Sequence, residues 1–170
     1  MGYGQTACAK CPLTHYSLLI TYHCLMNRRK ARELALQMLF QHEFTGHRSD
    51  FRAVEDLDPT KKEHKDIKAF SEELVNGTLT HLEEIDSRIR QAAEHWKMDR
   101  MASVDRNIMR FAVFELLYRN DIPPAVTINE SLEIAKKFSS LEAASFINGL
   151  LDKIAKESRK KASNVEVNDQ

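Results

Sequence analysis

The stretch SVDRNIMRFAVFELLY, residues 103–118, decides the fold. Apolar side chains recur in nearly every direction around a helix of this sequence, and neither glycine nor proline interrupts it. Ser103, at its start, is of a residue type that caps helices. Because a helix that is apolar all round has to be buried by its neighbours, this stretch predicts a central helix enclosed by others.

The segments before this stretch have the spacing of amphipathic helices. Apolar residues three and four positions apart recur over 28–44 and again over 67–96, where Asn76-Gly77 predicts a break between two helices. The polar stretch 46–59 predicts a loop or a short irregular helix. Each predicted helix therefore has one apolar face to turn toward the central one.

Two capping signals predict helices after the central stretch. Thr127 and Glu130 have the spacing of a capping box, in which a hydroxyl and a carboxylate bind opposing backbone amides. Ser139 and Glu142 repeat that spacing before the last long helix. Apolar spacing continues through Gly149, and we expect close helix packing to explain that glycine.

The composition favours helices and one compact domain. The chain has 170 residues, of which 42% are hydrophobic, with five glycines and four prolines. This content is enough for one core and disfavours many short strands joined by tight turns. Because 25 basic residues balance 25 acidic ones, any affinity for nucleic acid has to arise from where the charges lie.

The two ends differ in composition from the rest. We expect residues 1–25 to be a leader that is disordered or precedes the native start, because helical spacing begins at once after Met26. Residues 159–170 are charged or small and lack periodicity, which predicts a disordered tail. The folded domain should therefore span 26–158.

The leader also contains every cysteine of the chain: Cys8, Cys11 and Cys24. With nearby histidines they offer zinc ligands, but a structural zinc site needs a second well-spaced pair, so we predict no metal site. The apolar run 16–25 is too short to cross a bilayer and lacks the small residues of a signal cleavage site. These features predict a cytoplasmic protein.

The sharpest electrostatic feature is a run of four cations, Arg28, Arg29, Lys30 and Arg32. We expect it at the amino-terminal end of the first helix, where the helix dipole disfavours each cation by about 0.3–1 kcal/mol. A bound phosphate backbone would make the same cations favourable, because the phosphates attract them, so the run predicts contact with nucleic acid. The alternative is an ordinary basic start to a cytosolic protein.

A second polar group lies on the central stretch. Arg106 and Arg110 are one turn apart and share a face with Phe114. With Asn107 they form the only stripe of this helix that we expect to reach water, suited to phosphate or stacking contacts. The alternative is a solvated stripe without RNA, with Phe114 buried.

Two acidic residues of the same stretch, Asp105 and Glu115, lie toward its apolar sides and need partners if they are buried. They would form internal ion pairs or contact another protein. No catalytic motif accompanies them, because the sequence has no glycine-rich phosphate loop, no HExxH pair and no GxSxG elbow. We therefore predict a binding protein and not an enzyme.

Several segments together resemble the NusB family of transcription antitermination proteins. They are RRKARE at 28–33, ALQ at 35–37, VDRNIMR at 104–110, IP at 122–123, VTINESLEIAKKF at 126–138 and FINGLLD at 146–152. Their order and spacing follow the family from about residue 26 to 155. The first 25 residues lie outside the pattern, and LEAAS at 141–145 is more apolar than the usual turn.

The resemblance implies an all-α fold, a compact helical bundle of two packed halves. It implies binding of single-stranded boxA-type RNA with NusE, a small-subunit ribosomal protein, and action on RNA polymerase in rRNA operons, without a cofactor. Carried over by position, the RNA-binding residues would be Arg28, Arg29, Lys30, Arg32, Phe40, Arg106 and Arg110. The partner-binding residues would be Asp105 and Glu142.

Two other functions are alternatives. The same fold occurs as the amino-terminal domain of certain rRNA cytosine methyltransferases, but nothing after Ala155 has the strand periodicity or glycine loop of their α/β domain. A helical dimerisation module without RNA function agrees with the apolar central stretch but not with the clustered arginines. The sequence leaves open whether the free protein is a monomer or a homodimer.

Overall fold

The computed structural model describes residues 15–46, 60–93 and 97–167, and these ranges contain helices and no strand. The helices are α1 (His15–Thr45), α3 (Lys62–Thr80), α4 (Leu82–Ala92), the 3-10 turn η1 (Met98–Arg100), α5 (Ser103–Tyr118), α6 (Pro124–Phe138) and α7 (Leu141–Val167). None of the helices in these ranges is long and apolar enough to cross a membrane.

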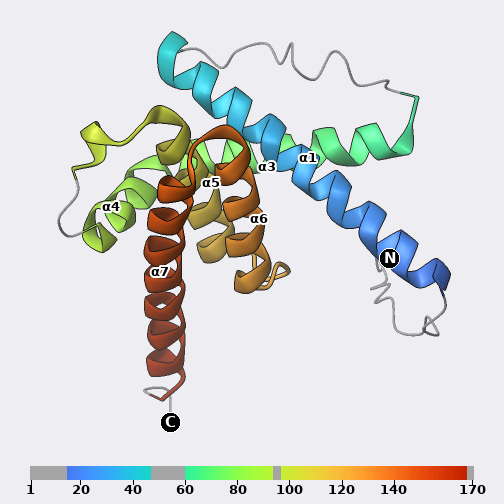
Figure 1. The fold of residues 1–170 in the computed structure, drawn as a ribbon. Helices are drawn as coiled ribbons and strands as arrows, with labels where there is room; N and C mark the ends of the chain where they lie inside the picture. Colours follow the sequence, from blue (N-terminus) through green and yellow to red (C-terminus); the bar gives the residue numbers. More distant parts are fainter. Residues whose placement is uncertain (1–14, 47–59, 94–96, 168–170) are drawn as a thin grey trace.

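Helix α5 is the centre of the bundle, as its sequence predicts. It contacts α1, α3, α4, α6 and α7 (Figure 1). Ile108, Met109 and Phe111 on this helix are fully buried. Around it, α1 packs mainly against α3, and α6 packs mainly against α7. The predicted all-α bundle is confirmed.

The glycines have different roles from those predicted. Helix α3 continues through Gly77 and the chain turns at His81, so the predicted break at Asn76-Gly77 is wrong. A Cβ atom at Gly77 would overlap the ring of Phe114, which shows that this glycine allows α3 and α5 to approach closely. Gly149 is exposed and has nothing within 4 Å of such a Cβ, so close packing does not explain it.

The predicted capping boxes are also wrong. Helix α6 begins at Pro124, a residue that is favoured in a first turn, so Thr127 lies inside the helix and its hydroxyl binds Glu115. Before α7 the capping oxygen belongs to Ser140, which accepts a hydrogen bond from the amide of Ala143 at 3.1 Å. Ser103 is the first residue of α5 and makes no cap hydrogen bond.

Both long helices extend further than expected, and their outer parts reach beyond the packed helices (Figure 1). Residues 15–25, which were predicted to be disordered or to precede the native start, are helical, and so are residues 159–167, which were predicted to be disordered. Helix α1 contains neither glycine nor proline, and residues 155–162 of α7, AKESRKKA, are nearly all Ala, Lys, Arg and Glu, which favour helix. Cys8, Cys11 and the rest of 1–14 lie outside the described residues, as do 47–59 and 168–170.

Candidate nucleic-acid and partner interface

The predicted basic run lies in the interior of α1, not at its amino terminus, because the helix begins at His15. The backbone amides of residues 28–32 are therefore not free to bind an anion, and the helix dipole no longer accounts for the cations. What each cation contributes depends instead on the side chains that surround it.

Arg32 is an internal residue. Its side chain is 1% exposed, and its Nε and Nη2 atoms donate to the two carboxylate oxygens of Glu115 at 2.7 and 2.9 Å. Thr127 donates a further hydrogen bond to Glu115 at 2.8 Å. The predicted partner for buried Glu115 therefore exists, and Arg32 connects α1 to the interior of α5 instead of to the surface.

Arg29 is also compensated by a carboxylate. Its Nε and Nη2 donate to the two oxygens of Glu130 on α6, each at 2.7 Å, and the Glu130 side chain is only 10% exposed. The hydrogen bond to Glu130 is the main cause of the raised pKa of Arg29. This pair holds α1 against α6.

Arg28 and Lys30 are the cations of the run that reach solvent. The Arg28 side chain is 43% exposed, and its Nη1 lies 3.9 Å from a carboxylate oxygen of Asp121. That carboxylate already accepts two hydrogen bonds from Arg119, at 2.7 and 2.9 Å. Lys30 is exposed. These two side chains are available to an anion.

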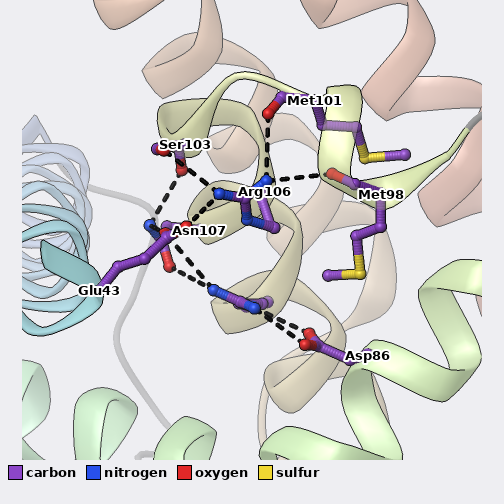
Figure 2. Close-up of polar contacts among 8 residues, drawn as sticks. Glu43, Asp86, Met98, Met101, Ser103, Arg106 and Asn107 are labelled. Atoms are coloured by element: carbon purple, nitrogen blue, oxygen red, sulfur yellow. Dashed lines mark hydrogen bonds and ion pairs between the residues drawn. The ribbon is translucent and has the colours of Figure 1, made fainter. Parts of the chain in front are cut away.

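Arg106 is held by polar groups of three elements (Figure 2). Its Nη1 donates to the carbonyl oxygens of Met98 and Met101 at 3.0 and 3.1 Å. Its Nη2 pairs with Glu43, near the end of α1, and donates to Ser103 Oγ at 3.2 Å. Arg106 therefore fixes η1 and the end of α1 to the start of α5.

Arg110 extends this network to Asp86 on α4, which Figure 2 labels. Its Nε and Nη2 donate to the two oxygens of Asp86, both at 2.8 Å. Asn107 Nδ2 donates to Glu43 at 2.6 Å, and Arg110 Nη1 lies 3.5 Å from the same carboxylate. The Arg106 and Arg110 side chains are 14% and 13% exposed, so the expectation of a wet polar stripe is wrong.

Phe40 lies at an open apolar pocket between α1, α5 and α6. Its ring is 36% exposed and lies 4.8 Å, centroid to centroid, from the ring of Phe44, which is 68% exposed. The pocket has a volume of about 250 Å³ and is lined by Leu36, Gln37, Phe40, Gln41, Val104 and Phe138. Unlike the arginines on α5, this surface is open to a ligand.

The two predicted partner-binding acids differ in their surroundings. Asp105 lies in the first turn of α5, and its Oδ1 is buried without a hydrogen-bond partner among the described residues. Glu142 is exposed in the first turn of α7. Its pKa is lowered by a hydrogen bond from its own backbone amide and, to a lesser extent, by the Ser140 hydroxyl, so it is a carboxylate at neutral pH.

Sequence reasoning missed the carboxylates that hold the arginines. Glu43 and Asp86 are ordinary acidic positions on helix faces, and Glu130 was assigned to a capping box. The only signal was indirect, namely that buried Glu115 required a partner. Among the described residues, no three His, Cys, Asp or Glu side chains are grouped as a metal site requires.

Known sequences are similar to most of this chain. The NusB family model matches residues 29–156. The transcription antitermination protein NusB of Geobacter sp. (strain M21) is 49% identical over 138 residues, which cover 77% of this chain and 95% of that protein. NusB of Desulfitobacterium hafniense (strain DSM 10664 / DCB-2) is 48% identical over 137 residues, covering 80% and 93%.

Solved structures are similar too. T. maritima NusB is 40% identical with a TM-score of 0.64, covering 76% of this chain and 91% of that one. NusB in a complex of the antitermination factors NusB and NusE with dsRNA is 26% identical with a TM-score of 0.65, covering 78% and 98%. The relatives are transcription factors and not enzymes. With a family match over most of its length, this chain belongs to the NusB family.

Proposed function

We propose that this chain is a transcription antitermination factor that binds boxA-type RNA together with a NusE-type ribosomal protein. One observation carries the proposal: a solved relative that is similar over 78% of this chain forms a complex with NusE and dsRNA. Relatives that are nearly half identical are named transcription antitermination proteins. The assembly would act on RNA polymerase during transcription of rRNA operons in the cytoplasm.

The exposed cations of α1 support the RNA-binding part of this function. Arg28 and Lys30 can each neutralise a phosphate and release a counterion, which makes binding sensitive to salt. Because Arg29 and Arg32 are already paired with carboxylates, we propose that they support this surface and do not bind phosphate. The ion pairs of Arg29 and Arg32 hold α1 in place, so the exposed cations beside them keep a fixed spacing.

The pocket beside Phe40 supports contact with bases. Unstacked bases of single-stranded RNA stack on aromatic rings, and Phe40 and Phe138 present rings on one open pocket. Gln37 and Gln41 on its lining carry amides that can donate to and accept from base edges. Phe40 is ten residues after Lys30, about 15 Å along the same helix, so one strand could reach both.

The acidic side chains support the protein-binding part. We propose that Asp105 and Glu142 receive basic or amide donors of the NusE-type protein. Asp105 is only partly buried in the first turn of α5, so a partner can approach its side chain there. Arg106 and Arg110 would keep this region of α5 in place through Glu43, without themselves binding RNA.

The test is RNA binding with and without a NusE-type protein over a salt series. We expect tight binding to boxA-type single-stranded RNA only when both proteins are present, and weaker binding to scrambled single-stranded RNA. Sedimentation of the same mixtures would show whether a homodimer dissociates as the complex forms. Equal affinity for boxA-type and scrambled RNA would contradict the boxA part of the proposal, and no binding to either RNA would favour a dimerisation module.

A further inference from the structure

The ring of Phe70, on α3, is surrounded by guanidinium groups. The Cζ atoms of Arg28, Arg32 and Arg119 lie 5.0, 5.4 and 5.4 Å from its centroid. A cation within about 6 Å of an aromatic centroid is attracted by the ring's quadrupole. Phe70 is only 8% exposed, so these contacts are partly shielded from water.

The three arginines differ in how fully carboxylates compensate their charge. Arg32 is buried against Glu115 at 2.7 Å. Arg119 donates to Asp121 at 2.7 Å. Arg28 reaches that carboxylate only at 3.9 Å, and its side chain is 43% exposed. The ring of Phe70 therefore restrains Arg28 alongside this long ion pair, and it leaves the charge of Arg28 available to an anion.

We propose that Phe70 is a positioning residue for the contact between Arg28 and RNA, an inference that rests on the function proposed above. An arginine free in solvent loses rotamer freedom when it binds phosphate, which weakens binding. The ring restrains the guanidinium of Arg28 before RNA arrives and supplies no competing hydrogen bond. Phe70 itself is covered and does not touch the nucleic acid.

A double-mutant cycle tests this inference. The variants are Phe70→Leu, Arg28→Ala and the two combined, assayed for boxA-type RNA binding with a NusE-type protein. Because a cation–π contact at a partly exposed site is weak, Phe70→Leu should reduce affinity about two- to fivefold. In the Arg28→Ala background it should have no further effect. Independent losses that multiply would show that Phe70 acts on structure in general, and would overturn the inference.

A shape-conserving change separates the ring's charge distribution from its packing. Pentafluorophenylalanine at Phe70 keeps an aromatic ring but reverses the quadrupole that attracts the cation. The same replacement at Phe111, which is fully buried on α5 and has no cation–π contact among the described residues, is the matched control. We expect reduced RNA affinity for the Phe70 protein only. Equal affinities of the two fluorinated proteins would overturn the inference.

The parent protein distinguishes failure of the inference from failure of the proposed function. If the parent with the NusE-type protein binds no RNA, the proposed function falls and the inference falls with it. If the parent binds and the effect of Phe70→Leu persists without Arg28, only the inference falls. Thermal unfolding of every variant, followed by circular dichroism, allows affinity to be stated per folded molecule.

Discussion

Arg32 and Lys30 are two positions apart in one basic run, yet they lie in opposite environments. Arg32 is 1% exposed against Glu115, which is 0% exposed, whereas Lys30 is exposed. Removing one member of a buried ion pair leaves the charge of the other member uncompensated in the core. Arg32→Met should therefore lower the free energy of unfolding by about 3–5 kcal/mol.

Lys30→Met is the matched control for Arg32→Met, because it removes one charge from the same segment. It should change stability by no more than about 0.5 kcal/mol. Urea unfolding of both variants measures the difference. Similar losses of stability for the two substitutions would mean that Arg32 is not held in the interior as described.

Two glycines provide a second contrast at the residue scale. An alanine Cβ at Gly77 would overlap the Phe114 ring, and overpacking of this kind costs about 1–3 kcal/mol. At exposed, helical Gly149 nothing lies within 4 Å, so alanine should stabilise the protein by about 0.5–1 kcal/mol. Melting temperatures should thus move in opposite directions. A decrease for Gly149→Ala would show an unrecognised role for that position.

The elements are joined by polar networks as well as by apolar faces. Arg106 connects α1, η1 and α5 and is 14% exposed. Arg106→Ala would remove a donor from two carbonyls and from one oxygen of Glu43, whose other oxygen still accepts from Asn107, and should cost about 1–3 kcal/mol. Exposed Arg90→Ala on α4 is the control, with a cost within about 0.5 kcal/mol. An equally small cost for Arg106 would return it to the solvent-facing role predicted from the sequence.

The contact between α4 and α5 predicts a pH dependence. Burial, and then a hydrogen bond donated to Glu84, raises the pKa of Tyr118 to about 12. An unfolded tyrosine ionises near pH 10, so above that pH the unfolded state releases this proton more readily than the folded state. The stabilisation is complete below about pH 10 and is lost as the pH rises through 12.

Tyrosinate absorbance measures this effect directly. Among the four tyrosines of the chain, Tyr118 should account for a late step near pH 12, which Tyr118→Phe should remove. If the substitution instead removes a step near pH 10, the hydroxyl is not held by Glu84 as described.

At the scale of the whole molecule, local patterns predicted elements better than partners. The all-round apolar character of α5 is contained in its own residues, so its burial could be predicted. The pairs Arg29 with Glu130 and Arg32 with Glu115 join residues 101 and 83 positions apart. No helical spacing encodes such distances. Thr127 and Glu130 have the three-residue spacing of a capping box. That spacing does not reveal that the Thr127 hydroxyl and the Glu130 carboxylate bind distant side chains instead of nearby backbone amides.

Because Arg29 and Arg32 are paired with distant carboxylates, fewer cations of the basic run are free to bind phosphate, and the expected salt dependence of RNA binding is smaller. Four phosphate contacts to single-stranded RNA would contribute about −2.8 to the log-log slope, but two exposed cations contribute about −1.4. Replacing Arg28 and Lys30 together with alanine should therefore flatten the slope by about 1.4. The affinities for boxA-type and scrambled RNA should fall by similar factors, because phosphate contacts carry no sequence information.

The control removes two exposed lysines of other helices, Lys68 and Lys156, and thus the same net charge. The salt slope of this control should match that of the parent if direct contact with phosphate, and not the total charge of the protein, determines the slope. Because both double variants lack only exposed cations, their helicity and unfolding should stay near those of the parent. If the control flattens the slope as much as Arg28 and Lys30 do, RNA senses the overall charge of the molecule, and α1 does not carry the site.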